Sequence, residues 1–539
     1  MLLGKIFEVT KTSPSVKETV SRQKRKFSRK KKTKKLSKKT LLIFSVVVLA
    51  SLTVRLFFLF RFEDPENTHP GWYEDAYHHW QVAYLSWKIG FKHGFLRLWD
   101  LKGMEYFWGS LHPLILGGLM RLAGTNSIVV ARLLSLVCGA FNVGFLYLLV
   151  KRYFGKQAGL AAAAIAAFNP VGIYSDTSGM QEPLGILMLF LGVFFWPKKA
   201  VLTGFFWMLA GMVRAEYWLM AIGLMLLLLI VRVGLEKKLF AWLGFVSLMG
   251  LYMKHLLDRT GNAIYPMYWN FLGNMKGKWQ ANLPPNSAQL LAQKIYIGVL
   301  GAMVLFGIWL MIKRPKFLPF FAIGVGNWTI LGLTVGLSKY LLSYMTRFWV
   351  DRIMILPYMF LAVWFSAVIF KFLGKRWFFS LIGWLLVLGL ISATQFLWRP
   401  IWYWRGMTEG QWESKVALAE GVSQYYEGGR VLFFENHPAS TYWLVYHEGI
   451  EGDKIIGQMF DPYFYMEGDP YDNWGENREI VLDWLKKEDI RLMAFLGDRE
   501  RYLRLVEKEP KFFERLGFDP RWNLYLYQIN LNEWPSQES

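Results

Sequence analysis

Long apolar runs alternate with short polar segments along most of the chain, a pattern typical of a polytopic membrane protein. The first run, Leu41–Phe60, holds about 20 mostly apolar residues, enough for one membrane-spanning helix. Further runs lie near residues 126–150, 157–174, 183–197, 201–213, 216–232, 239–254, 294–312, 317–337, 353–370 and 377–397. The pattern therefore predicts an α-helical membrane protein with about 11 spans. Two short runs flank Arg214-Ala215-Glu216, so residues 201–232 form either a short hairpin or one broken helix.

Basic residues predict the orientation of these spans. Residues 1–40 hold about 15 Lys and Arg against two Glu, and the first run lacks a small-residue cleavage site, which is typical of a signal anchor with a cytoplasmic N-terminus. With alternate crossing, every predicted inner loop is basic; these loops hold Lys151-Arg152, Lys198-Lys199, Arg232 with Lys237-Lys238, Lys313-Arg314-Lys316, and Lys371 with Lys375-Arg376. The positive-inside rule then places the C-terminus outside the cytoplasm.

The last part of the chain has a different pattern. Residues 401–539 hold about 25 acids against about 15 bases, and residues 398–539 alternate between strand-like and helix-like periods. Strands are expected at Arg430–Phe434, Leu492–Leu496 and Leu524–Ile529, and helices at Glu476–Lys487 and Arg499–Glu509. We interpret the chain as a basic cytoplasmic tail (1–40), a transmembrane domain (41–397) and a small extracytoplasmic α/β domain (398–539).

Composition supports the interpretation as a membrane protein and indicates which membrane it occupies. The 539 residues are 54% hydrophobic with a mean hydropathy of +0.23, too apolar for an ordinary soluble protein. The formal charge of +22 would suit nucleic-acid binding, but the positive-inside rule already accounts for the basic tail. Cys138 is the only cysteine, and the only glycosylation sequon, Asn327-Trp328-Thr329, lies within a predicted span. A large outer region without cysteines or usable sequons favours a prokaryotic plasma membrane over the eukaryotic endoplasmic reticulum.

Ionisable residues near the spans gather at their outer ends, which predicts a polar cavity that opens away from the cytoplasm. They are Glu74, Asp75, Asp176, Glu182, Arg214, Glu216, His255, Asp258, Arg347, Asp351 and Arg352. Two outer loops, 61–125 and 255–293, flank this cavity, and the first holds five of the eight histidines. Within it, Glu74 and Asp75 stand four residues before His78 and His79. On a helix each acid would face an imidazole, a spacing that can hold a divalent metal ion.

The order of these motifs resembles the GT-C superfamily of integral-membrane glycosyltransferases, particularly the protein O-mannosyltransferase and aminoarabinose-transferase branch. The similar elements are an outer-loop acidic pair in Glu74-Asp75-Ala76-Tyr77, then Leu111-His112-Pro113-Leu114, Arg132-Leu133-Leu134, Glu182-Pro183-Leu184, Arg214-Ala215-Glu216 and Arg352–Pro357. The similarity spans roughly residues 41–397. In the family the acidic pair reads Asp then Glu, whereas here the order is reversed, so both carboxylates are candidates for the base.

The resemblance implies transfer of a sugar from a polyprenyl-phosphate carrier to a glycan, lipid or protein acceptor on the outer face, with inversion. It implies that Asp75 or Glu74 is the general base, and that Arg352, Arg347 or Arg214 holds the leaving phosphate. Tyr77, His79, His112, Glu182 and Glu216 are expected to support the substrates. The chain has no P-loop or dinucleotide fingerprint, so a nucleotide sugar is not expected, and a divalent metal is the one cofactor considered.

Each assignment has a simpler alternative. The acidic pair can be a solvated helix cap, the histidines can be hydrogen-bonded interfacial residues, and His112 before Pro113 can be a turn residue. Glu182, Arg214 and Glu216 can be structural ion pairs. Arg347 and Arg352 can face lipid headgroups or Asp351. A different class of protein, a transporter or lipid flippase, would show repeated halves and a midplane site; the sequence has no internal repeat.

Overall fold

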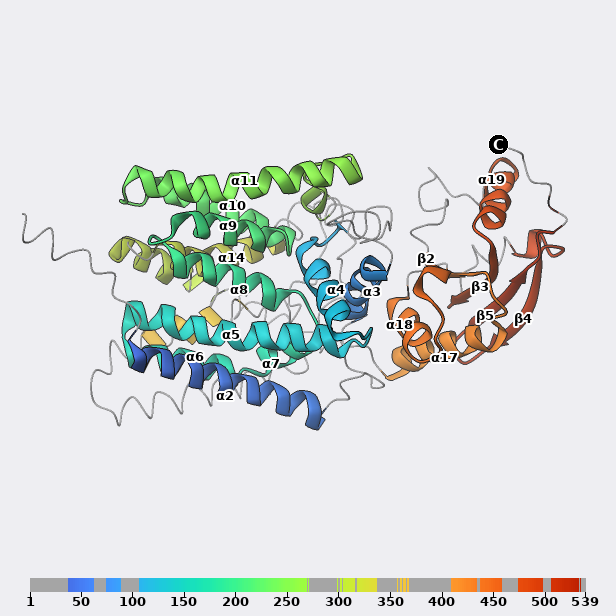
Figure 1. Ribbon diagram of the computed structural model, residues 1–539, viewed down its shortest axis with the longest axis horizontal. Coiled ribbons are helices and arrows are strands. Elements are labelled where there is room, and N and C mark those ends of the chain that lie inside the picture. The colour runs from blue at the N-terminus through green and yellow to red at the C-terminus, as the bar shows by residue number, and fades with distance from the viewer. Residues whose placement is uncertain are drawn as a thin grey trace, which may run out of the picture. The chain divides into compact units, whose positions relative to one another are not determined.

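The computed structural model describes residues 37–62, 74–88, 106–268, 270, 298, 301–302, 304–315, 318–336, 356, 359–360, 362–364, 366–367, 409–433, 437–457, 474–497, 506–532 and 534. Residues up to Val46 and residues from Val47 onward form two separate units. The described part of the first unit is the start of helix α2 (Lys38–Phe62). All other elements labelled in Figure 1 belong to the second unit.

Helices dominate the chain before residue 340, as the apolar runs predict. They are α3 (Glu74–Lys88), α4 (Leu111–Ala123), α5 (Val129–Phe154), α6 (Lys156–Ala167), α7 (Pro170–Thr177), α8 (Glu182–Phe195), α9 (Ala200–Gly211), α10 (Ala215–Ile230), α11 (Leu235–Thr260) and α14 (Leu318–Gly336). Apolar helices are thus confirmed at most of the predicted runs. The run 377–397 and most of 353–370 lie outside the described residues.

Few of these helices can cross a membrane by length alone. Within the described ranges, Lys38–Phe60, Val129–Phe154 and Leu235–Thr260 are long and apolar enough, and Lys156–Ala167 with Val171–Thr177 adds a fourth if the bent pair is one span. The shorter apolar helices, which include α4, α8, α9 and α10, have 10 to 17 residues. The total of about 11 spans therefore stays a prediction.

The run 157–174, predicted as one helix, is broken into α6 and α7, which meet at an angle of 62°. Pro170 begins α7 and has no backbone N–H to continue the hydrogen-bond ladder of α6. The Asn169 side chain accepts a hydrogen bond from the Val171 backbone N–H at 3.0 Å and so caps the new helix. The break follows from an Asn-Pro pair that the hydrophobic pattern alone does not reveal.

Residues 201–232 form two helices, α9 and α10, that pack against each other, which matches the hairpin alternative. Helix α9 also packs closely on α11 through paired glycines. A Cβ atom on Gly204 would lie 1.9 Å from the Ala241 carbonyl oxygen, and one on Gly244 would lie 2.1 Å from that of Val201. Small residues permit this backbone approach, a common device of helix pairs in membranes.

The C-terminal region contains a five-stranded mixed sheet in the order β2-β1-β3-β5-β4 (Figure 1). The strands are β1 (Arg430–Phe433), β2 (Ile455–Gly457), β3 (Ile490–Leu496), β4 (Phe513–Asp519) and β5 (Leu524–Ile529). Strands β1, β2 and β3 pair in parallel, whereas β5 pairs antiparallel with β3 and β4. The three predicted strands are confirmed.

Helices α17 (Glu409–Tyr425), α18 (Pro438–Tyr446) and α19 (Trp474–Lys487) accompany the sheet. The predicted helix Glu476–Lys487 corresponds to α19, while most of the predicted helix Arg499–Glu509 lies outside the described residues. A buried cluster that includes Leu432, Leu482, Met493 and Phe513 joins the sheet to α19. Because this region buries its own apolar side chains, it has the core expected of a folded α/β element.

Candidate active site

The acidic pair begins helix α3. Glu74 and Asp75 occupy the first turn and are only partly buried, whereas residues 76–86 are buried. Carboxylates are favourable at this end because the helix dipole is positive there. The predicted outer segment therefore holds its two acids at the edge of a buried helix.

Three imidazoles and one indole lie close together, and two of these imidazoles follow the acidic pair on α3. The rings of His78 and His79 lie 4.6 and 5.0 Å from the ring of Trp108, and the His79 ring lies 5.4 Å from that of His112. Among the residues that the structure describes, no group of three or more His, Cys, Asp or Glu side chains could hold a metal ion. The predicted metal set thus gains no support from these residues.

His112 lies in the first turn of α4 and is fully buried, so it is a helix residue and not a turn residue. Neither of its ring nitrogens has a hydrogen-bond partner among the described residues. Burial lowers the pKa of His112 to about 3, because the charged imidazolium loses its hydration. The side chain is consequently a neutral imidazole at physiological pH.

A tight contact joins the start of α4 to the connection between α9 and α10. The Leu111 backbone N–H donates to the Met212 carbonyl oxygen at 3.0 Å. Gly109 has a φ of +148°, and a Cβ atom there would lie 2.4 Å from the same oxygen. Glycine is required at this approach. The contact brings the His112 segment to the connection that holds Arg214.

Arg214 pairs with two carboxylates at this connection. Its Nη1 contacts Glu182 Oε1, while Nε and Nη2 donate to the two oxygens of Glu216 at 3.0 and 2.8 Å. Glu182 begins α8 and Glu216 lies in the first turn of α10. The geometry matches the structural ion-pair alternative. The role of Arg214 in phosphate binding stays a prediction, and a phosphate would have to compete with both acids.

Tyr77 lies one turn beyond Glu74 and is fully buried. Arg132 Nη2 donates to the Tyr77 hydroxyl at 3.4 Å. Arg132 is itself fully buried in α5, so the Arg132-Leu133-Leu134 element lies beside the helix that carries the acidic pair. Arg347 and Arg352, the other predicted phosphate ligands, lie outside the described residues.

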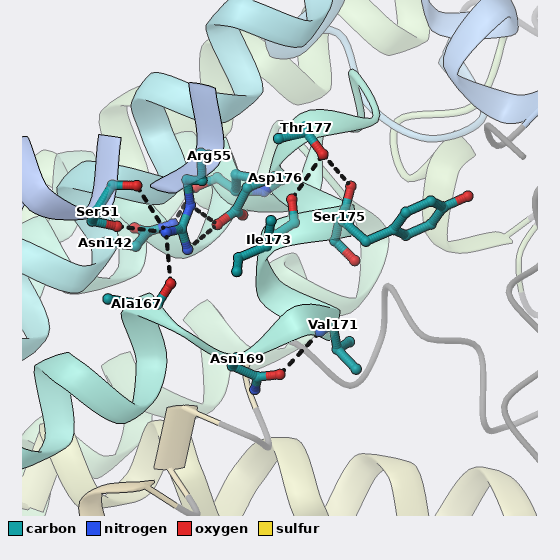
Figure 2. A network of polar contacts seen from close by, with 12 residues as sticks. Ser51, Arg55, Asn142, Ala167, Asn169, Val171, Ile173, Ser175, Asp176 and Thr177 are labelled. Atoms are coloured by element: carbon teal, nitrogen blue, oxygen red, sulfur yellow. Dashed lines mark hydrogen bonds and ion pairs between the residues drawn. The ribbon is translucent and has the colours of Figure 1, made fainter. Parts of the chain in front are cut away.

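One polar network was not anticipated from the sequence (Figure 2). Arg55, inside the first apolar run, contacts Asp176 of α7 through Nε and Nη2 at 2.8 and 2.7 Å. Its Nη1 also donates to the Ser51 backbone oxygen and, at 3.3 Å, to the Ala167 carbonyl oxygen at the end of α6. Both charged side chains are almost fully buried. Arginine within an apolar run was the available signal.

Part of the chain is similar to a known protein family. The family model for dolichyl-phosphate-mannose-protein mannosyltransferase matches residues 110–256. The matched segment contains His112, Arg132, Glu182, Arg214 and Glu216 but neither acid of the pair. No curated protein sequence matched the chain.

Two solved structures resemble most of the chain. The archaeal oligosaccharyltransferase AglB from Archaeoglobus fulgidus, in complex with an inhibitory peptide and a dolichol-phosphate, has a TM-score of 0.52 at 13% identity and covers 92% of this chain and 75% of its own. ArnT from Cupriavidus metallidurans in the apo state has a TM-score of 0.51 at 13% identity, covering 90% of this chain and 97% of its own. At this identity, the likeness establishes the fold.

Proposed function

We propose that the chain transfers a sugar from a polyprenyl-phosphate carrier to an acceptor on the outer membrane face, as enzymes of the GT-C superfamily that it resembles do; the fold shared with AglB and ArnT supports this proposal. The matching family model is that of dolichyl-phosphate-mannose-protein mannosyltransferase, and the similar AglB structure contains a dolichol-phosphate. A lipid-linked phosphate donor agrees with both. The acceptor is a glycan, a lipid or a protein.

The acidic pair carries the mechanistic part of the proposal. Glu74 and Asp75 are partly exposed at the start of α3, while the following turns are buried. A carboxylate in this position can take the proton of the acceptor hydroxyl as the hydroxyl oxygen attacks the anomeric carbon. The bond from that carbon to the carrier phosphate breaks, and the anomeric configuration inverts.

Asp75 is our first choice for the base, and Glu74 is the alternative. The leaving polyprenyl phosphate gains negative charge that an arginine fork can match with two hydrogen bonds. We assign this role to Arg352 first, then to Arg347 and Arg214. Tyr77, His79, His112, Glu182 and Glu216 then shape and support the site.

The proposed setting is the plasma membrane of a prokaryote. The basic segment 1–40 would lie in the cytoplasm, and residues 398–539 would lie outside as an α/β domain. With about 11 spans, the acidic pair and the C-terminal region share the outer side, where a carrier that has crossed the membrane presents its sugar.

Purified protein incubated with radiolabelled polyprenyl-phosphate sugars and a cell-envelope extract tests the proposal. We expect label to move from the carrier to an acceptor, and the anomeric configuration of the product to be inverted. Glu420→Gln, which removes an exposed acid from α17, serves as a matched control and should retain transfer. Movement of intact labelled carrier across vesicles without any glycosylated product would instead support a flippase.

A further inference from the structure

Two helices of the C-terminal region pack against the helix that begins with the acidic pair. The ring of Tyr442, from α18, lies 5.4 Å from that of Tyr77 and 4.9 Å from that of Trp80. The ring of Trp412, from α17, lies 6.1 Å from that of Tyr77. These aromatic contacts fix α17 and α18 on α3 within the second unit.

Lys415 of α17 reaches the acidic pair across this contact. Its Nζ lies 3.3 Å from Glu74 Oε1, and the side chains of Lys415 and Glu74 are 15% and 39% exposed. Trp412 and Lys415 are three residues apart on α17, as Glu74 and Tyr77 are on α3. Residues at this spacing lie on one helix face, so the aromatic pair and the ion pair form one matched contact.

The ammonium of Lys415 has a second partner besides Glu74. Its Nζ lies 2.6 Å from Nδ1 of His437, which precedes α18 and is almost fully buried. Because a protonated amine can only donate, Nδ1 is the acceptor. The Ser440 hydroxyl donates to the Lys415 carbonyl oxygen at 2.8 Å and joins α18 to α17. The lysine therefore has a fixed place and not the freedom of a surface side chain.

We propose that Lys415 is a positioning residue that holds Glu74, and with it the first turn of α3, in the geometry needed for transfer. The inference rests on the proposed function of the acidic pair. With Lys415 mostly buried and Glu74 partly buried, solvent screens this pair less than a surface pair, and a fixed cation beside a carboxylate restricts the rotamers of that carboxylate. Through Lys415 the C-terminal region becomes part of the active-site assembly.

The test compares Lys415→Met with Lys415→Arg and with the control Lys487→Met, which removes an exposed lysine from α19. We expect Lys415→Met to lower kcat for transfer about tenfold, as loss of orientation does, while KM for the labelled donor stays unchanged. Lys415→Arg should recover most of the activity, and Lys487→Met should match the wild type. Wild-type kcat in Lys415→Met would overturn the proposal.

A double-mutant cycle shows whether Lys415 acts through Glu74. Added to Glu74→Gln, Lys415→Met should change kcat no further; an undiminished tenfold loss would overturn the inference. If Glu74→Gln alone abolishes transfer, the cycle is read from the thermal unfolding temperatures of the four proteins, where additive shifts would overturn it. Absence of transfer by the wild-type protein would count against the proposed function, and the unfolding cycle would still test the pair.

Discussion

At the scale of single residues, the buried neutral imidazole of His112 predicts how stability depends on pH. Its pKa in the folded protein is about 3, below the ordinary value near 6.5, so the unfolded chain binds the proton more tightly. The free energy of unfolding therefore decreases as the pH falls from about 6.5 toward 3. At pH 5 this loss amounts to about 2 kcal/mol.

We therefore expect the unfolding temperature of the wild-type protein in detergent to fall more steeply between pH 7.5 and pH 5 than that of His112→Leu, which cannot be protonated. Parallel curves for the two proteins would show that His112 is not buried in its neutral form.

Some residues of the candidate site could be predicted and others could not. Glu74, Asp75 and their spacing to His78 and His79 are local features, so the sequence reveals them. The contact of Lys415 with Glu74 joins residues far apart in the chain, and no local pattern encodes it. The partners of Arg214 were predictable because Glu216 is two residues away and Glu182 begins a nearby apolar run.

At the scale of secondary-structure elements, the Arg55–Asp176 pair joins α2 to α7, and a hydrogen bond from Arg55 to the Ala167 carbonyl oxygen joins α2 to the end of α6. A Cβ atom on Gly139 of α5 would lie 2.2 Å from the Asp176 carboxyl, so the pair fills a closely fitted space. Removing one partner leaves the other charge buried without compensation, at a cost of about 3–5 kcal/mol. We expect Arg55→Met to lower the unfolding temperature strongly.

Replacing both charges, in Arg55→Met with Asp176→Leu, should recover part of this loss because no buried charge remains. Lys254→Met is the matched control, because it breaks an exposed ion pair with Asp258. The side chains of Lys254 and Asp258 are 73% and 52% exposed. That pair is worth about 1 kcal/mol or less. Equal shifts in Arg55→Met and Lys254→Met would contradict this account of the buried pair.

The secondary-structure elements were predictable where a single hydrophobic pattern dominates the segment. Apolar runs identified α5, α8, α10 and α14 because helices in a membrane need continuous apolar surface. Strand β4 was missed, since Glu514 and Arg515 interrupt its apolar character and it lies at the sheet edge. Edge strands commonly carry charge in this way.

At the scale of the whole molecule, the resemblance predicted from the motif order agrees with the family model that matches residues 110–256 and with the fold shared with AglB and ArnT. No single motif carried that prediction; their order and shared side of the membrane did. The span count, the domain boundaries and the orientation stay predictions, because they depend on the membrane as well as on the chain.

The orientation is open to a direct test. Alkaline phosphatase fused after residue 539 should be active in a bacterial host, because the C-terminus is predicted outside, where that enzyme folds. A green fluorescent protein at the same position should be dark. The reverse pattern would place the C-terminus in the cytoplasm and overturn the outer position of the active site.

The central claim is that the acidic pair of α3 performs transfer from a lipid-linked donor, and Asp75→Asn tests it most directly. The substitution is nearly isosteric and removes the proton acceptor, so transfer of labelled sugar should fall about 100-fold or more while the donor still binds. Glu420→Gln should transfer normally. If Asp75→Asn is active and Glu74→Gln is not, the base is Glu74. Normal transfer by both variants would contradict the account.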